Sequence, residues 1–258
     1  MATSQYKLDR KGRRLRWLKA RNAERSYYRQ LLQVARVVSQ TVKSLHGGPG
    51  YVAAGSKEFK RVTQALENYG TIIAPWAQSV AEYMLADVAR RNEKAWVEHG
   101  REMGVEFKKQ IQQTGIGHAY RALMAEQVTL IQSIPLDAAE KVHEMVEQGL
   151  HTSERSAQIA KRVMELADMP MWRAKLIART EVSRSSVTLT QVRAQNLGSH
   201  GYIWRTSRDG DVRPTHKEME GVYVPWDHPP KTDKSLSPYH AGCGPNCRCW
   251  PEPVLPEY

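Results

Sequence analysis

Apolar residues recur every three or four positions along most of the chain up to Gly198, the spacing that places them on one face of an α-helix. Residues 6–46 contain no proline between Tyr6 and His46, which favours one continuous helix. Residues 10–21 are basic on nearly every side. We therefore expect a solvated or DNA-facing helical extension that continues into a packed helix. Its apolar positions are Leu15, Leu18, Tyr28, Leu31, Leu32, Ala35 and Val38.

Glycine and proline divide the middle of the chain into further helices. Residues 47–50, Gly-Gly-Pro-Gly, form a strong break after the first helix. Residues 56–113 then have helical periodicity, and Pro75 is expected to interrupt this stretch or to start a new helix within it. Residues 114–117, Thr-Gly-Ile-Gly, form the next break. This region is therefore predicted to be α-helical throughout, with apolar stripes that face a core.

The helices that follow are bounded by proline and by capping residues. A helix is predicted over residues 120–133, and Pro135 is expected to open a separate segment, 136–149. Thr152 and Ser153 are typical N-cap residues for a helix that runs through Leu166. The last long helix is predicted to start at residues 168–170 and to end near Gly198.

The pattern changes after Gly198. Residues 202–206 alternate and are rich in β-forming residues, Asp209 and Gly210 form a hairpin signal, and residues 222–224 favour a short strand. Residues 225–256 are rich in Pro, Gly and Asp, so little regular structure is expected there.

The predicted fold class is therefore mainly α with a small α+β C-terminal domain. A helical N-terminal body is followed by a long helix, a β-hairpin and a loop-rich cap. The expected regions are a basic helical arm over residues 1–46, an α-helical region over 51–155 and an α+β domain over 156–258.

Composition supports a hydrophobic core and argues against a membrane span and a secretory signal. Hydrophobic residues make up 41% of the 258 residues, yet no apolar run is long enough for a membrane span. The charged N-terminus has no apolar segment after it, so no secretory signal is expected. The three cysteines lie together between residues 243 and 249, which is not the pattern of a disulfide framework.

Positive charge is concentrated at the N-terminus. The chain carries a net charge of +11, and residues 1–46 hold twelve Lys and Arg against two acidic residues, a net +10. Such a segment favours a polyanionic partner, most simply nucleic acid bound through its phosphates whatever its sequence. A solvated helix face is the plain alternative. The candidate DNA-binding residues are Arg10, Lys11, Arg13, Arg14, Arg16, Lys19, Arg21 and Arg25.

Four sequence elements in the C-terminal third resemble one family. They are Ile177-Ala-Arg-Thr-Glu181, Trp204 to His216 with its Val-Arg-Pro-Thr-His ending, Met219-Glu-Gly221, and His240 to Cys249 followed by Pro251. Their order, spacing and residue types resemble the Mu F-like, or phage head morphogenesis, domain over about residues 160–256. The Cys-Gly-Pro at residues 243–245 departs from the shorter His-Pro ending typical of that family.

The resemblance implies a phage minor capsid protein rather than an enzyme. Such proteins are assembled into the prohead in the host cytoplasm, in few copies, and lie inside the capsid near the portal and the packaged DNA. The implied partners are the portal protein, capsid or scaffolding proteins and double-stranded DNA, without a membrane. A portal-binding role for the basic arm is then a further alternative to DNA contact.

Cysteine and histidine near the C-terminus raise the question of a metal. Zinc takes four such ligands in tetrahedral geometry, so His240, Cys243, Cys247 and Cys249 form a candidate zinc site, with His216 able to fold back nearby. Buried reduced thiols, or a cysteine pair close enough to oxidise, are the alternatives.

A second polar set accompanies these residues. Arg and carboxylate side chains pair strongly, which favours a structural network that ties the last long helix to the hairpin. The alternative is a Mu F-related toxin or nuclease-like enzyme that uses Arg179, Glu181 and His216, with His216 or Glu181 as general base. The sequence ends nine residues after Cys249, which we take to leave no room for an added toxin domain. A cellular nucleic-acid-binding protein with a zinc-stabilised tail explains fewer of the elements. The network residues are Arg179, Glu181, Asp209, Arg213 and His216.

Overall fold

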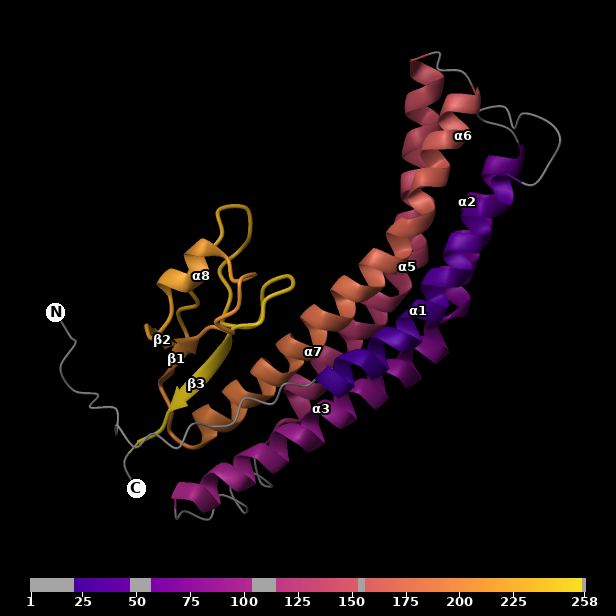
Figure 1. Ribbon diagram of the computed structural model, residues 1–258. Helices are drawn as coiled ribbons and strands as arrows, with labels where there is room; N and C mark the ends of the chain where they lie inside the picture. The colour runs from indigo at the N-terminus through magenta and orange to yellow at the C-terminus, as the bar shows by residue number, and fades with distance from the viewer. Residues whose placement is uncertain (1–20, 47–56, 104–114, 153–155, 257–258) are drawn as a thin grey trace. The chain divides into compact units, whose positions relative to one another are not determined.

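The computed structural model describes residues 21–46, 57–103, 115–152 and 156–256 (Figure 1). The chain forms two compact units, each built from segments distant in sequence. Residues 21–87 and 120–182 form the first, called here the helical unit. Residues 88–119 and 183–258 belong to the second, called here the mixed unit. Residues 1–20, which hold the first half of the predicted basic arm, lie outside the described part of the chain.

Among the described residues of the helical unit, all regular structure is helical. Helix α1 contacts α2, α6 and the short 3₁₀ helices η1 and η2. Helices α3 and α7 supply residues to both units. The elements are α1 (Arg21–Lys43), η1 (Ser44–His46), α2 (Lys57–Ile72), α3 (Ala74–Met103), α5 (Gly117–His151), α6 (Ser156–Glu165), η2 (Leu166–Asp168) and α7 (Met169–Asn196).

The predicted amphipathic character of the first helix is confirmed over α1. One face is fully buried, with Tyr27, Leu31, Val34 and Val38 among the core residues. The predicted effect of Pro75 is also confirmed: α2 ends at Ile72 and α3 begins at Ala74, so the proline occupies the first turn, where its missing N–H has no helical partner to lose.

Pro135 does not break the helix, and the prediction of two separate helices there is wrong. Helix α5 runs without interruption from Gly117 to His151 with Pro135 inside it. Contacts with α2 explain the continuity. A Cβ atom on Gly70 of α2 would lie 2.9 Å from Leu136 Cδ2 and 3.5 Å from Pro135 Cγ. The side-chain amide of Gln132 also donates to the Gly70 carbonyl, at 2.9 Å. These tertiary contacts offset the roughly 3 kcal/mol that an interior proline costs.

A three-stranded antiparallel sheet organises the mixed unit. The strands are β1 (Gly201–Arg205), β2 (Tyr223–Pro225) and β3 (Trp250–Val254), in the order β2-β1-β3. In the register, Tyr202 of β1 lies opposite Val224 on one side and Pro253 on the other. The fold class predicted from the sequence, mainly α with a small α+β C-terminal part, is therefore confirmed.

Asp209-Gly210 is not the turn of a two-stranded hairpin. Strand β1 and its partner β2 are joined by residues 206–222, which include the short helix α8 (Pro214–Glu218). Asp209 instead shapes a local turn, since its Oδ1 accepts from the Asp211 amide at 3.2 Å. The hairpin signal was strong because Asp-Gly suits any tight turn, not only one between strands.

Strand β3 was not expected, because two prolines lie within it. Pro251 faces Trp204 and Pro253 faces Tyr202 in the register with β1. Since β3 is an edge strand, its alternate residues direct their backbone groups to the open side, where a missing N–H breaks no ladder bond. The loop character predicted for the rest of residues 225–256 is confirmed.

The core of the mixed unit joins the sheet to two long helices. It contains Trp96 of α3, Ala194 of α7, and Tyr202 and Trp204 of β1. Cys247 and Cys249 belong to the same core. Within the described residues, no helix combines the length and the apolar content that crossing a bilayer requires.

Candidate metal centre

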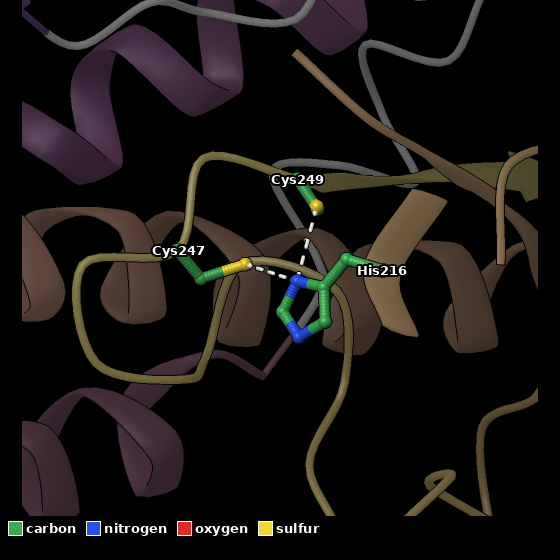
Figure 2. A group of neighbouring side chains, drawn as sticks. All are labelled: His216, Cys247 and Cys249. Carbon is green, nitrogen blue, oxygen red and sulfur yellow. Dashed lines mark hydrogen bonds between the residues drawn. The ribbon is translucent and has the colours of Figure 1, made fainter. Parts of the chain in front are cut away.

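Three side chains that can ligate a metal converge in the mixed unit (Figure 2). His216 lies in α8. Cys247 lies in the loop before β3, and Cys249 is the residue immediately before β3. Pro214 fixes the first turn of α8, which places His216 in the helix facing the core. The two cysteines, separated by one residue, both belong to the buried core cluster.

The three ligand atoms lie close together and away from solvent. The Nδ1 atom of His216 lies 3.5 Å from Cys247 Sγ and 3.5 Å from Cys249 Sγ. All three ligand atoms lie within 4.8 Å of one another. The exposed fractions are 2% for His216, 3% for Cys247 and 2% for Cys249.

The outer nitrogen of His216 is held by a second layer of residues. Its Nε2 atom lies 3.0 Å from the Tyr239 hydroxyl and 3.4 Å from Thr232 Oγ1. When Nε2–H donates to Tyr239, the Nδ1 lone pair points at the two sulfur atoms. The Trp204 indole also packs edge-on against the His216 imidazole, with ring centroids 5.3 Å apart. Both nitrogens are therefore occupied, which leaves His216 no free position as a general base.

The two thiols differ in their affinity for a proton. The hydrogen bond from the Cys249 thiol lowers the pKa of Cys247, and the bond with His216 adds to this, although burial acts the other way. The same bond and burial raise the pKa of Cys249. Cysteine sulfur and histidine nitrogen are together the donor types of soft and borderline metal ions.

The loop that carries Cys247 is held against α8 and the sheet by backbone contacts. The Arg213 guanidinium donates to the Pro245 carbonyl at 2.7 Å. Gly242 has a φ of +89°, and a Cβ atom there would lie 2.7 Å from the Cys249 carbonyl oxygen. Asn246, immediately before Cys247, also has a left-handed φ of +54°. These conformations turn the loop sharply enough to direct both sulfur atoms inward.

Charged pairs on the rim fix the connection between β1 and β2. Arg248 donates to Asp209 at 2.9 Å and to Asp211 at 2.8 Å. Burial by itself would raise the pKa of Glu220, but hydrogen bonds from the Thr206 hydroxyl and amide outweigh it, and the pKa falls to about 2. Glu220 also accepts from Arg208 at 3.0 Å. Arg248 and Glu220 are thus each paired with polar groups of this connection.

The structure assembles only two of the four ligands predicted from the sequence. Cys247 and Cys249 are in the centre, but His240 and Cys243 are not members of the group. His240 Nδ1 instead lies 3.2 Å from the Tyr202 hydroxyl, and burial lowers the pKa of His240. His216 takes the histidine position. The Cys243 amide donates to the His240 carbonyl at 3.0 Å, which closes a turn between these two residues.

The predicted polar network is distributed over both units. Arg179 and Glu181 belong to the helical unit, whereas Asp209, Arg213 and His216 belong to the mixed unit. Arg179 lies 3.4 Å from Glu24, and Glu181 accepts from Gln127 at 2.7 Å. Arg213 instead donates to the Pro245 carbonyl, and Asp209 accepts from Arg248.

Of the predicted DNA-binding residues, six lie outside the described part of the chain: Arg10, Lys11, Arg13, Arg14, Arg16 and Lys19. Arg21 and Arg25 lie on α1 and are exposed. Their neighbours on the same helix, Tyr27 and Leu31, are buried. The region predicted as one basic arm over residues 1–46 therefore includes a helix that packs into the core of the helical unit.

Comparison with known proteins supports the family resemblance. Residues 140–251 match the family described as Phage Mu protein F like protein. An uncharacterized protein of Haemophilus influenzae is 34% identical over 135 residues, which are 52% of this chain and 29% of that protein. The chain therefore spans less than a third of the length of this relative. No solved structure matches the chain.

The matched range includes the end of α5, all of α6 and α7, the sheet strands β1 and β2, and the three residues of the candidate metal centre. It also includes every element on which the resemblance rests, from Ile177 to Pro251. Residues 140–251 therefore form a domain of the Phage Mu protein F like family.

Proposed function

We propose that this protein is a minor capsid protein of a phage, located inside the head near the portal, where it takes part in head assembly and contacts the packaged DNA. The observation that carries the proposal is the Phage Mu protein F like match over residues 140–251. That family is one of phage head morphogenesis, whose members are generally structural. The proposed partners are the portal protein, capsid or scaffolding proteins and double-stranded DNA of any sequence.

A basic stripe on α1 supports the contact with DNA. Five exposed cations occupy the solvent face of this helix, and at 100° per residue they fall within about 80° of arc. The stripe spans 22 residue steps, or about 33 Å, which is close to one turn of B-DNA. Glu24 is the acidic residue of α1, and it pairs with Arg179. The stripe consists of Arg21, Arg25, Arg29, Arg36 and Lys43.

Burial argues against the enzymatic alternative. His216 is 2% exposed and has both ring nitrogens engaged. Glu181 is 7% exposed and accepts a hydrogen bond from Gln127 inside the helical unit. A general base has to reach a substrate proton within hydrogen-bond distance, and neither side chain is open to one. The structural interpretation of both residues is therefore favoured over a toxin or nuclease-like activity.

The interior location predicts protection from protease. In purified particles that contain this chain, added protease should leave it intact, because the shell excludes the enzyme. After the particles are opened by heat or chelator, the same treatment should digest it. Immunoblotting against the chain, with a major capsid protein as control, measures both states. Complete digestion in intact particles would contradict an interior location.

The basic stripe predicts a specific change in salt dependence. Replacing Arg29, Arg36 and Lys43 by Gln in the full chain should weaken binding to duplex DNA of unrelated sequences equally. It should also reduce the slope of log K against log [salt] by roughly 3, because about 0.9 counterion is released for each phosphate neutralised. Filter binding at several salt concentrations measures both quantities.

The matched control removes the same charge elsewhere in the helical unit. Arg121, Lys141 and Lys161 are exposed on α5 and α6 and do not form a stripe, so their replacement by Gln should leave the slope nearly unchanged. Equal loss in both triple variants would attribute binding to net charge and not to the stripe. Deletion of residues 1–20 separately measures the contribution of the N-terminal cations without removing the core residues of α1.

A further inference from the structure

We propose that His216, Cys247 and Cys249 bind one Zn²⁺ ion, which fastens the ligand loop of residues 240–249 to α8 and to β3. This inference concerns the stability of the mixed unit and does not depend on where the protein lies in the virion. It also replaces the ligand set expected from the sequence, because His216 takes the place of His240 and Cys243.

The distances match those of a tetrahedral zinc site. With Zn–S of about 2.3 Å, Zn–N of about 2.0–2.1 Å and tetrahedral angles, a sulfur and a nitrogen ligand lie about 3.5–3.6 Å apart. Both Nδ1–Sγ distances in the structure are 3.5 Å. Figure 2 shows both sulfur atoms directed toward the same ring nitrogen from different parts of the loop.

A thiol–imidazole hydrogen bond explains this arrangement less completely. A neutral imidazole whose Nε2 carries the proton has one lone pair on Nδ1, which suits one S–H donor at a time. Here two sulfur atoms lie at the same distance of 3.5 Å from Nδ1. A cation between the three atoms satisfies all of them together. The hydroxyl of Tyr239, 3.0 Å from Nε2, supplies the outer partner that metal-bound histidines generally have.

The donor set favours zinc over the common hard cations. Two thiolates and one imidazole suit a borderline or soft cation, and the group contains no carboxylate that would favour Mg²⁺ or Ca²⁺. Two thiolates balance the charge of Zn²⁺, so the buried site is neutral overall, which removes most of the penalty for burying an ion. On binding, the protons held by the sulfur atoms pass to solvent and two Zn–S bonds form.

The segment around the site has little regular structure that could hold its shape without a cross-link. Between β2 and β3, residues 226–249 form no helix or strand, yet they supply four core residues of the mixed unit: Trp226, Ala241, Cys247 and Cys249. A structural ion gives a loop of this kind a fixed shape that hydrogen bonds alone hold weakly. Among the described residues, no further His, Cys, Asp or Glu joins the group.

The test measures metal in the full-length protein and in matched variants. The chain is purified under reducing conditions and its zinc content is determined by elemental analysis. The wild type should contain about one zinc per chain, and Cys249→Ser should reduce this at least tenfold. Cys243→Ser and His240→Gln are the matched controls, since they change the same residue types in the same loop and should leave the zinc content unchanged.

A second measurement uses the wild type alone, so its result does not depend on whether the variants fold. Zinc in the wild type is exchanged for Co²⁺, and the absorption spectrum is recorded. Sulfur-to-cobalt charge-transfer bands, with visible bands of tetrahedral intensity, are expected from two thiolate ligands. Their absence would overturn the proposal whatever the variants do. So would a wild type that contains no zinc and, once its three thiols are shown to be reduced, takes none up. Loss of zinc in Cys243→Ser or His240→Gln would overturn the three-residue ligand set.

Discussion

Gly242→Ala should destabilise the mixed unit by about 2–5 kcal/mol and disrupt the ligand loop. A left-handed φ of +89° costs a residue with a Cβ atom roughly 1–2 kcal/mol. The added methyl would also lie 2.7 Å from the Cys249 carbonyl oxygen and 2.9 Å from Val187 Cγ2. Overpacking of this kind typically adds 1–3 kcal/mol, and here the close atoms belong to backbone and to a branched side chain that cannot easily move. Urea denaturation monitored by near-UV circular dichroism measures the change.

Two other glycines separate the causes of this effect. Gly210→Ala meets no atom within 4 Å and requires no positive φ, so it should change stability by less than about 1 kcal/mol. Gly198→Ala has a φ of +80° but ordinary contact with Pro256 at 3.4 Å, so it should show the conformational penalty alone. If Gly242→Ala were no worse than Gly198→Ala, the close approach between the loop and Cys249 would not be important for stability.

The helices were predictable because their apolar spacing reports directly on burial. The stripe that contains Leu31 and Val38 is buried as its period indicated, and Pro75 lies in the first turn of α3. Pro135 and strand β3 were not predictable in the same way. In both places a local rule, that proline breaks regular structure, is overridden by tertiary context: Gly70 lies against α5, and β3 pairs on one side only. The sequence contains no local signal for either contact.

The sequence predicted the residue types of the metal centre, Cys and His, but not which residues form it. Clustering in the sequence favoured His240 with the three cysteines, and two of these four residues are in the centre. His216 was identified, but within the polar set rather than as a ligand of first choice. Proximity along the chain was a poor guide because α8 supplies a histidine from 31 residues before Cys247. Tyr239, which orients that histidine, had no signal of its own.

A buried polar chain joins three helices of the helical unit. Tyr27 of α1 donates to Gln127 Oε1 at 2.9 Å, and Gln127 Nε2 donates to Glu181 Oε2 at 2.7 Å. Burial, with the charge of Glu181 adding to it, raises the pKa of Tyr27, so its hydroxyl remains a donor. Gln127 is completely buried and bonds to both of the others. It therefore couples α1 to the Arg179-Thr-Glu181 element of the Mu F-like domain.

Gln127→Leu should destabilise the protein by about 3–4 kcal/mol. It removes one hydrogen bond to a buried carboxylate, worth roughly 1.5–3 kcal/mol, and deprives the Tyr27 hydroxyl of its acceptor at a further cost of about 1 kcal/mol or more. Gln132→Leu is the matched control on the same helix. It removes one neutral hydrogen bond, to the Gly70 carbonyl, from a half-buried position, and should cost about 1 kcal/mol.

A double-mutant cycle decides whether these residues act as one unit. Tyr27→Phe combined with Gln127→Leu removes the orphaned hydroxyl, so the double variant should be at least about 0.5 kcal/mol more stable than the sum of the single effects predicts. Simple additivity would mean that the polar chain is not coupled. A large, coupled loss in unfolding free energy would instead give Glu181 a structural role in joining α7 to α5 and α1, which accounts for a buried carboxylate in this element without any catalytic chemistry.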